Sequence, residues 1–581
     1  MFKIKKLWGH ISGRRKKQFY LLLVLMTVSS FVEIVSIGAV LPFLTILTAP
    51  EQIYQHLYMQ PVINVLNISS ADQLLLPITL LFIFLAVFAA SVRLLLLYVL
   101  TRLSYAIGAD LSVDMYKRTL YQPYLSHISR NSSEVINGII LKCNTVTGAV
   151  ITPVLTLISS SVLTIFIVTA LISIDPTSAL IATIALGVLY SIVIIYTRKQ
   201  LQHNSKTIAK LTTQVIKSLQ EGMGGIRDVL IDGSQQFYCK LYRDADVRQR
   251  RAAGNNKFIA QSPRFFMEAI GMTFIAGLAY FMSLRDGSMA MTIPVLGALA
   301  LGAQRLLPAL QQGYGSYSRI KGADSSLYDV LELLDQPLPN YANKPQTKTI
   351  MFNKDIVLDG INFKYGSNHP WVLKDINLII EKGSRVGFIG KTGSGKSTLL
   401  DVVMGLLEPT ENRLLIDGIV VTSENRRAWQ LHIAHVPQNI YLSDSTVEEN
   451  IAFGVAKENI SLQQVKKAAK QAKIAELIES WDDGYQTFVG EQGIRLSGGQ
   501  RQRIGIARAL YKRADVLIFD EATSALDSAT EREVMESIED LGKELTILII
   551  AHRLTTLKKC TKIVKLDKNI ISTIAYEEIT E

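Results

Sequence analysis

Cysteine is scarce in this sequence, with three residues in a chain of 581. Cys143, Cys239 and Cys560 are scattered along the chain and lack the spacing of a metal site. We expect all three to be reduced, structural residues in a protein that faces the cytosol. The sequence therefore gives no indication of a metal centre built on cysteine.

Motifs for nucleic-acid binding are also missing, although the formal net charge is +11. Basic residues close to anionic lipid head groups explain part of this charge more simply. We therefore expect no nucleic-acid partner.

Acidic residues are absent from the segment before the first long apolar run. That segment carries seven basic residues, which are Lys3, Lys5, Lys6, Arg14, Arg15, Lys16 and Lys17. Such a cluster stays on the cytoplasmic side of a membrane, so the amino terminus is predicted to be cytoplasmic.

Long apolar runs fill the first 335 residues and are missing from the rest of the chain. Candidate spans lie near residues 20–48, 74–100, 147–173, 178–196, 265–284 and 289–311. Most of them have about the length that crosses a bilayer. Buried helices of a large soluble protein are the alternative, which six such runs in one half of the chain disfavour. The first run is long and is followed by five more, so we expect a span and not a cleavable signal peptide.

Six crossings from a cytoplasmic start return the chain to the cytoplasm before residue 320. The later sequence has the charged, alternating texture of a soluble α/β domain. The predicted fold is therefore an all-α membrane domain over residues 1–335, with six transmembrane helices and long cytoplasmic extensions. A linker at 336–349 joins it to a C-terminal α/β P-loop ATPase domain at 350–581. We expect a multi-pass protein of the cytoplasmic (inner) membrane with both termini in the cytoplasm.

Two stretches between the predicted spans are long, polar to mixed, and rich in helix-forming residues. We expect each to form a helical hairpin that reaches the ATPase domain. The candidate contact turns are residues 121–124 and 222–228, where proline or glycines allow a sharp reversal. In the outward loop, residues 51–68 form either a short amphipathic helix at the outer membrane surface or a simple connector.

Ionisable residues inside membrane spans are expensive and often functional. Arg264 and Glu268 stand four positions apart, so they share a helix face and can pair with each other. Arg305 has no acidic neighbour in the sequence. It either faces the lumen, where it would attract an anion, or it snorkels or pairs with Glu33 from another span. For Arg305 we favour the lumen slightly.

A glycine-rich phosphate-binding loop follows a predicted strand at residues 385–389. Its residues are Gly390, Lys391, Thr392, Gly393, Ser394, Gly395, Lys396 and Ser397, and Thr398 continues into a helix. The glycines let backbone N–H groups cradle phosphates at a helix start, where the helix dipole favours negative charge. Lys396 would reach the β- and γ-phosphates of ATP, and the Ser397 hydroxyl would bind Mg²⁺.

An acidic pair follows a second predicted strand, the apolar residues 516–519. Asp520 is placed to hold Mg²⁺, and Glu521 can act as general base on the attacking water. Two ordinary surface acids are the alternative. The apolar strand argues against it, because ligands of α/β sheets bind at the carboxyl ends of buried strands.

These motifs, in this order, resemble those of the nucleotide-binding domain of an ABC transporter over residues 350–581. The whole chain is similar to the exporter arrangement of six spans followed by that domain. The resemblance implies that Tyr365 stacks on adenine and that Gln438 contacts Mg²⁺. The signature residues Ser497, Gly498, Gly499 and Gln500 would close over the γ-phosphate held by a partner chain. Asp527 would lie in a loop at the dimer interface, and His552 would bind the γ-phosphate as a catalytic residue beside Glu521.

The resemblance implies ATP and Mg²⁺ as cofactors and a homodimer, because every motif of the composite sites is intact in this chain. Segments around residues 31–44, 262–271 and 301–308 are similar to PglK-type lipid-linked oligosaccharide flippases. In that family, cavity arginines attract the pyrophosphate of a polyprenyl carrier. Arg264 and Arg305 look like matches to those arginines, so the resemblance makes them our candidate substrate residues. A further basic position of that family is replaced here by Gln311 and Gln312. We therefore expect an ATP-driven flippase of a lipid-linked oligosaccharide or related anionic glycolipid. The alternative is a broad-specificity exporter of lipids, drugs or peptides.

Overall fold

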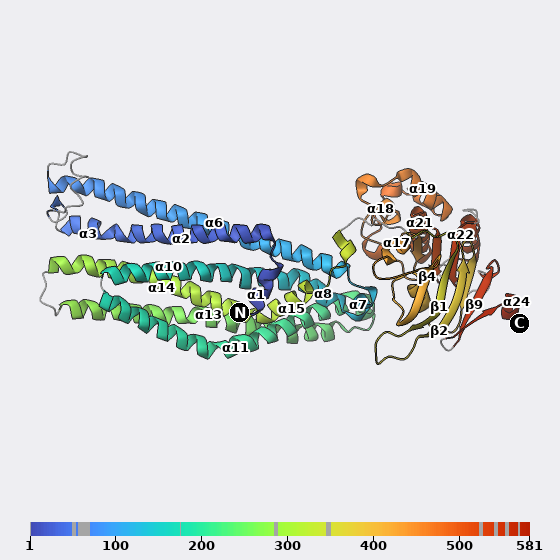
Figure 1. Ribbon diagram of the computed structural model, residues 1–581, viewed down its shortest axis with the longest axis horizontal. Coiled ribbons are helices and arrows are strands. Elements are labelled where there is room, and N and C mark those ends of the chain that lie inside the picture. Colours follow the sequence, from blue (N-terminus) through green and yellow to red (C-terminus); the bar gives the residue numbers. More distant parts are fainter. Residues whose placement is uncertain are drawn as a thin grey trace. The chain divides into compact units, whose positions relative to one another are not determined.

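The computed structural model describes residues 2–48, 51, 54–55, 70–174, 176–283, 289–343, 350–521, 527–539, 544–551, 557–567 and 570–580. The chain divides into two compact units. The first comprises Met1–Gln122 and Arg130–Pro337, and the second comprises Pro123–Ser129 and Leu338–Glu581. The first unit is helical and the second contains both sheets and helices (Figure 1). The domain boundaries expected from the sequence remain a prediction.

The long helices of the first unit are α2 (Gly13–Gly38), α6 (Leu75–Leu120), α10 (Thr152–Ile174), α11 (Pro176–Gly224), α13 (Gln235–Ser283) and α14 (Met289–Gly322). The shorter ones are α1 (Phe2–His10), α3 (Val40–Thr48), α8 (Ser132–Asn137), α9 (Cys143–Val146), α12 (Ile226–Ile231) and α15 (Asp324–Leu334). Helix α6 has 46 residues, and α11 and α13 have 49 each. At about 1.5 Å per residue, each is roughly twice as long as the bilayer core is thick. The expected extension of the helices beyond the spans is confirmed.

Four helical stretches among the described residues are long and apolar enough to cross a membrane. They are Gly13–Leu47, Leu75–Leu120, Ser132–Ser173 and Thr183–Gly224. Large apolar side chains such as Leu76, Phe84 and Ile195 are more than half exposed on these helices. Extended apolar surface of this kind is typical of a face that meets lipid. The membrane character of this unit is therefore confirmed, whereas six crossings are not.

Both long stretches between the predicted spans turn at the positions that the sequence predicted. Helix α6 ends at Leu120 and α7 (Tyr124–Ser129) follows. Helix α11 ends at Gly224 and α12 starts two residues later. Most of residues 51–68 lie outside the described residues, so the amphipathic helix expected there remains a prediction.

The helix that leads into α10 contains two π-helical turns, Gly138–Lys142 and Thr147–Ile151, on either side of α9. Such turns are rare and frequently occur at functional sites. The second turn packs closely on α6, because a Cβ at Gly108 would lie 2.3 Å from Thr147 Oγ1. Only glycine therefore fits at this crossing unless Thr147 moves.

The second unit contains two sheets. An antiparallel sheet has the order β2-β1-β4-β5 and consists of β1 (Asp355–Phe363), β2 (Leu373–Glu381), β4 (Glu411–Ile416) and β5 (Ile419–Val420). The larger sheet has the order β10-β9-β3-β8-β7-β6. Its strands are β3 (Arg385–Ile389), β6 (Ile433–Val436), β7 (Val516–Asp520), β8 (Thr546–Ile550), β9 (Lys562–Asp567) and β10 (Ile570–Ile574). All its neighbours pair in parallel except β10 and β9. The predicted strands at 385–389 and 516–519 are confirmed.

The helices of the second unit that bear on its function are α16 (Lys396–Val403), α19 (Leu462–Gln471), α20 (Ala475–Glu479), α21 (Gly498–Tyr511) and α22 (Ser528–Glu539). They flank the larger sheet, and strand β7 divides its side chains between two cores. Val516 and Ile518 belong to a core shared with α16, and Leu517 and Phe519 belong to a core shared with α19 and α21. Successive side chains of a strand point to opposite faces, so an all-apolar strand is covered on both sides. This explains why the predicted strand has no polar face.

His435 on β6 is a half-buried imidazole whose buried Nε2 atom has no hydrogen-bond partner among the described residues. Burial lowers its pKa to about 4. The unfolded chain takes up a proton below its own pKa of about 6.5, whereas the folded chain resists protonation until about 4. The stability contributed by neutral His435 is therefore lost as the pH falls from about 6.5 to about 4.

We expect the ATPase domain to lose up to about 2 kcal/mol of unfolding free energy between pH 7 and pH 5 through this residue. The His435→Leu variant should lose less over the same range, as measured by thermal unfolding of the full chain at several pH values. His369→Leu, at an exposed histidine, should retain the pH dependence of the wild type. Equal pH dependence in all three proteins would contradict the assignment.

Candidate functional site

The loop between β3 and α16 makes a tight turn that depends on glycine. Gly390, Gly393 and Gly395 have φ values of 148°, 82° and 97°. A Cβ at Gly390 would lie 2.3 Å from the carbonyl oxygen of Leu566, so no side chain fits there. Gly395 caps α16 in a left-handed conformation that a side chain rarely adopts. The loop therefore places its backbone N–H groups next to the amino terminus of α16, a position at which anions bind favourably.

Lys396 lies under this loop, with its side chain largely buried. Its Nζ atom donates to the carbonyl oxygens of Gly390 at 2.7 Å and Lys391 at 3.1 Å. The ammonium group is thus fixed at the start of the loop that is expected to hold phosphates. The Ser394 hydroxyl is buried and has no hydrogen-bond partner among the described residues. The backbone N–H of Ser394 donates to Lys391 at 3.1 Å, which closes the turn, and Thr392 is exposed.

The acidic residue at the end of β7 meets the start of α16. Ser397 Oγ donates to Asp520 Oδ1 at 3.5 Å. Burial raises the pKa of Asp520, and the hydrogen bond from Ser397 partly opposes this shift. A hydroxyl and a carboxylate side by side are hard oxygen donors of the kind that Mg²⁺ prefers. These two residues therefore fit the magnesium ion expected from the sequence.

Glu521 follows directly and is held in a strained backbone conformation, with φ of 50°. Its backbone N–H donates to the carbonyl of Ile550 at 3.2 Å. Its carboxylate accepts a hydrogen bond of 2.7 Å from Gln438 Nε2. The structure thus brings Gln438 and Glu521 together, and Asp520 and Ser397 adjoin them. This is the arrangement that a general base and an adjacent metal site require.

Asp401 has a place in this group that the sequence analysis missed. It stands four residues after Ser397, so the two share one face of α16. Burial raises its pKa to about 6, and the charge of Asp520 adds to the shift. Burial also raises the pKa of Tyr124 on α7, with further contributions from Asp401 and Tyr365. The i,i+4 spacing was the one signal in the sequence that pointed to this third carboxyl group.

Tyr365 lies beside the same helix. Its hydroxyl is 2.9 Å from Thr398 Oγ1, and its ring packs edge-on against Phe363 with centroids 5.0 Å apart. The side chain is therefore positioned next to the phosphate-binding helix. Stacking on adenine remains a prediction.

The Ser497–Gln500 segment forms the amino terminus of α21. Gln500 N donates to Ser497 Oγ at 3.3 Å, and Ser497 N donates to Gln500 Oε1 at 2.8 Å. This capping box leaves Gly498 and Gly499 in the first turn, and Ser497 is exposed. An exposed, glycine-containing helix start suits a phosphate, but the described contacts of Ser497 and Gln500 are with each other.

Asp527 caps α22. Its carboxylate accepts hydrogen bonds from the backbone N–H groups of Ala529 at 3.1 Å and Thr530 at 3.0 Å, and from the Thr530 hydroxyl at 2.7 Å. These hydrogen bonds, those of Thr530 first, lower the pKa of Asp527. Its role at a dimer interface remains a prediction. His552 and residues 524–526 lie outside the described residues. The catalytic role expected for His552 therefore remains a prediction.

The charged residues of the membrane helices are paired. Arg264 Nε lies 2.7 Å from Glu268 Oε1 on the same helix. Arg305 Nε lies 3.3 Å from Glu33 Oε1, and Arg93 Nε lies 3.2 Å from Glu33 Oε2. Glu33 is only 3% exposed, so one buried carboxylate holds two arginines from different helices. Arg305 therefore takes the partner that the sequence analysis gave as the alternative to a free position in the lumen.

A cavity of about 1300 Å³ opens among α9, α11, α13, α14 and α15. Arg264 and Glu268 are among its lining residues, and Arg305 is not. Much of the lining consists of side-chain amides, which are Asn137, Asn144, Gln249, Asn256, Gln261, Gln311 and Gln312. Asn137 Oδ1 and the Ser318 hydroxyl have no hydrogen-bond partner among the described residues. In the sequence, Gln311 and Gln312 stand out only as a departure from the basic position of the resembled family. Amides from different helices come together only in the fold.

Two protein families match the chain. Residues 373–524 match the family described as ABC transporter, and residues 37–306 match the ABC transporter transmembrane region. The chain is also similar over its length to a solved structure of a bacterial Atm1-family ABC exporter with ATP bound. The TM-score is 0.79 at 22% identity, over 97% of this chain and 96% of that chain. This similarity shows a common fold.

Proteins named ATP-dependent lipid A-core flippase are similar in sequence. The one from Alkalilimnicola ehrlichii is 29% identical over 474 residues, which are 80% of this chain and 79% of that protein. The one from Francisella tularensis subsp. holarctica is 30% identical over 480 residues, which are 81% and 77% of the two chains. The one from Escherichia coli K12 is 32% identical over 397 residues, which are 67% of each chain.

The position of Lys396 leads to a test by mutation. We expect Lys396→Ala to weaken nucleotide binding at least tenfold, because the buried ammonium is fixed at the phosphate-binding loop. The matched variant Lys391→Ala removes an exposed lysine from the same loop but leaves its backbone carbonyl in place, so it should weaken binding less. Titration with a fluorescent ATP analogue measures both affinities. Equal losses would show that loop charge, and not the position of Lys396, determines binding.

Proposed function

The chain belongs to the ABC transporter family, as an exporter-type half-transporter, and we propose that it flips an anionic, glycan-bearing lipid across the inner membrane. As a member of this family it binds ATP, hydrolyses it and couples the hydrolysis to transport. The similar proteins named above are lipid A-core flippases, which supports a lipid as the transported molecule. A lipid-linked oligosaccharide is the finer proposal, and it rests on the cavity lining and on the membrane arginines.

The amide lining of the cavity is the observation that carries the glycan part. Amide groups both donate and accept hydrogen bonds, so they match the hydroxyl groups of a sugar. A cavity for purely apolar cargo would not retain such groups. The polar head group is thus proposed to bind between α9, α13 and α14.

The arginines supply the attraction for an anion. Glu33 neutralises only one of the two positive charges of Arg93 and Arg305, which leaves a net positive charge inside the membrane domain. We propose that the phosphate of the lipid competes with Glu33 for these arginines. Phosphate offers more acceptor oxygens than a carboxylate, so it can bind both guanidinium groups at once, which favours the exchange.

In the ATPase domain, the proposed roles follow from the contacts. Lys396 and the backbone of residues 390–395 bind the phosphates, and Ser397 and Asp520 would hold Mg²⁺. A bound Mg²⁺ supplies neutralisation of phosphate charge. Glu521, held by Gln438, is positioned to accept a proton from the attacking water. His552 is proposed to contact the γ-phosphate.

Two copies of the chain are proposed to form the working transporter. Members of this family function as dimers. The exposed helix start at Ser497 would complete the phosphate site of the other chain. ATP binding would then close the two ATPase domains, and hydrolysis would release them. This is a two-state element biased by the charge of a ligand, which gives alternating access. Both termini are proposed to lie in the cytoplasm.

The first experiment measures ATP hydrolysis by the purified chain in lipid vesicles, with and without a polyprenyl-pyrophosphate glycan. We expect Glu521→Gln to lower the rate by about 10²-fold or more, because it removes the general base. Glu476→Gln, an exposed carboxylate on α20, should hydrolyse ATP as the wild type does. Hydrolysis that depends on Glu521 but is unaffected by this lipid, and is stimulated by many unrelated amphiphiles, would favour the broad-specificity exporter.

The second experiment tests the arginine site. We expect Arg305→Ala to lower flipping of the anionic glycolipid at least tenfold while ATP hydrolysis without cargo continues. We expect Glu33→Gln to bind the lipid more tightly than the wild type, because the competing carboxylate is gone. Arg102→Ala, an exposed arginine of α6 over the ring of Tyr98, serves as the control. Full flipping by Arg305→Ala would refute the arginine site.

A further inference from the structure

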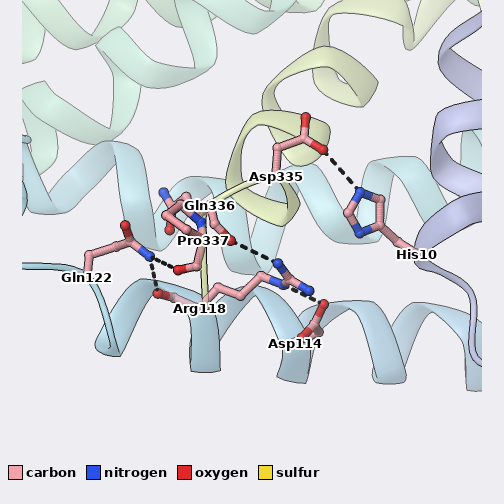
Figure 2. Close-up of polar contacts among 7 residues, drawn as sticks. All are labelled: His10, Asp114, Arg118, Gln122, Asp335, Gln336 and Pro337. Atoms are coloured by element: carbon pink, nitrogen blue, oxygen red, sulfur yellow. Dashed lines mark hydrogen bonds and ion pairs between the residues drawn. The ribbon is translucent and has the colours of Figure 1, made fainter. Parts of the chain in front are cut away.

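The chain passes between the two compact units at places that lie close together. It leaves the first unit after Gln122, at the end of the first long helix of the hairpin, and again after Pro337, where the linker begins. These two points are 215 positions apart in sequence, yet Gln122 Nε2 donates to the carbonyl oxygen of Pro337 at 3.0 Å (Figure 2). The hairpin and the linker are therefore hydrogen-bonded to each other at the points where they leave the first unit.

Arg118, one turn earlier on the same helix, binds the preceding carbonyl. Its Nη1 atom donates to the carbonyl oxygen of Gln336 at 2.8 Å, and its Nε atom donates to Asp114 Oδ2 at 2.8 Å. Asp114 thus orients the guanidinium toward the linker, as Figure 2 shows. Gln122 Nε2 also donates to the carbonyl of Arg118 at 2.8 Å, which fixes its amide. We call these contacts of Arg118 and Gln122 with the carbonyls of Gln336 and Pro337 the linker clasp.

The amino-terminal helix holds the same segment from another side. Asp335 ends α15, and its carboxylate pairs with Lys6 at 2.5 Å and His10 at 3.1 Å. Residues 335–337 are therefore fixed through one side chain by α1, and through two backbone carbonyls by Arg118 of α6 and by Gln122, two residues after the end of α6. Since the clasp binds backbone carbonyls, it fixes the path of the chain and not one particular side chain.

The conformation of the linker at Gln336 is unfavourable unless other contacts stabilise it. The Gln336 side chain is 6% exposed, and neither atom of its amide has a hydrogen-bond partner among the described residues. A buried unpaired amide opposes the conformation that buries it. The hydrogen bonds of the clasp offset this cost, so their removal should release the linker.

We propose that Arg118 and Gln122 are positioning residues for energy coupling, which make the linker and the first cytoplasmic hairpin follow helix α6 as one element. A movement of α6 is then passed to the ATPase domain by two routes in step, through the hairpin turn and through the covalent linker. With the clasp broken, the linker moves independently of α6, and the nucleotide state is transmitted incompletely to the membrane domain.

The test compares the wild type with Arg118→Ala, Gln122→Ala and Gln122→Glu in the full chain. Gln122→Glu keeps the size of the side chain but replaces the donor by a carboxylate that repels the carbonyl of Pro337, which guards against a folding defect. Hydrogen exchange is followed by mass spectrometry with and without ATP and vanadate. No cargo is needed, so the outcome is independent of the proposed glycolipid. Arg102→Ala is the control from the same helix.

In the variants, we expect peptides that cover residues 335–343 to exchange at least fivefold faster than in the wild type without nucleotide. ATP should still protect the peptide at residues 390–403, because the phosphate loop is intact. The ATP-dependent change in peptides from the membrane part of α6, present in the wild type and in Arg102→Ala, should fall at least threefold. If α6 responds to ATP in the variants as it does in the wild type, the clasp has no part in coupling and the proposal is wrong.

Discussion

Parallel pairing of four buried strands is the constraint on which the ATPase domain depends. Strands β3, β8, β7 and β6 run in one direction, so their carboxyl ends meet at one edge of the sheet. The phosphate loop leaves β3 at that edge, Asp520 and Glu521 leave β7, and Gln438 follows β6. Residues more than a hundred positions apart thus form one site, because parallel pairing places the carboxyl ends of these strands at the same edge of the sheet. The apolar side chains of β7 hold this edge in place from two cores at once.

The membrane domain follows a different rule, since charge there must be balanced locally. Glu33, Arg93 and Arg305 come from three helices and meet at a single buried carboxylate. Such a cluster ties α2, α6 and α14 to one another, because the loss of one partner would leave a buried charge unpaired. Its excess positive charge favours the binding of an anion. The same residues therefore contribute to structure and to recognition, and a change in one of them alters both.

The ATP site was largely predictable from sequence, and the cargo site was not. The phosphate loop and the pair Asp520–Glu521 are local motifs whose spacing reflects one turn or one strand end, so linear pattern carries the information. Gln438 came from family resemblance, and its contact with Glu521 needed the sheet. The partner of Arg305 remained open, because the spacing of residues along the sequence does not show which residues of different helices form an ion pair. The amide lining of the cavity escaped notice for the same reason. Asp401 shares a helix face with Ser397 at i,i+4 spacing, but its proximity to Asp520 is visible only in the fold.

The two π-helical turns around α9 have a consequence for how this transporter can diversify. A π turn takes up one additional residue, which shifts the register of the helix that follows it. The four residues Cys143–Val146 between the turns are consequently rotated with respect to both flanks. Asn144 and Thr145 of this interval line the cavity, so substitutions at these two positions can reshape its wall. Cys143 and Val146 are buried in the core that includes α6, so they are expected to tolerate little change. A new cargo could thus be accommodated without rebuilding the scaffold.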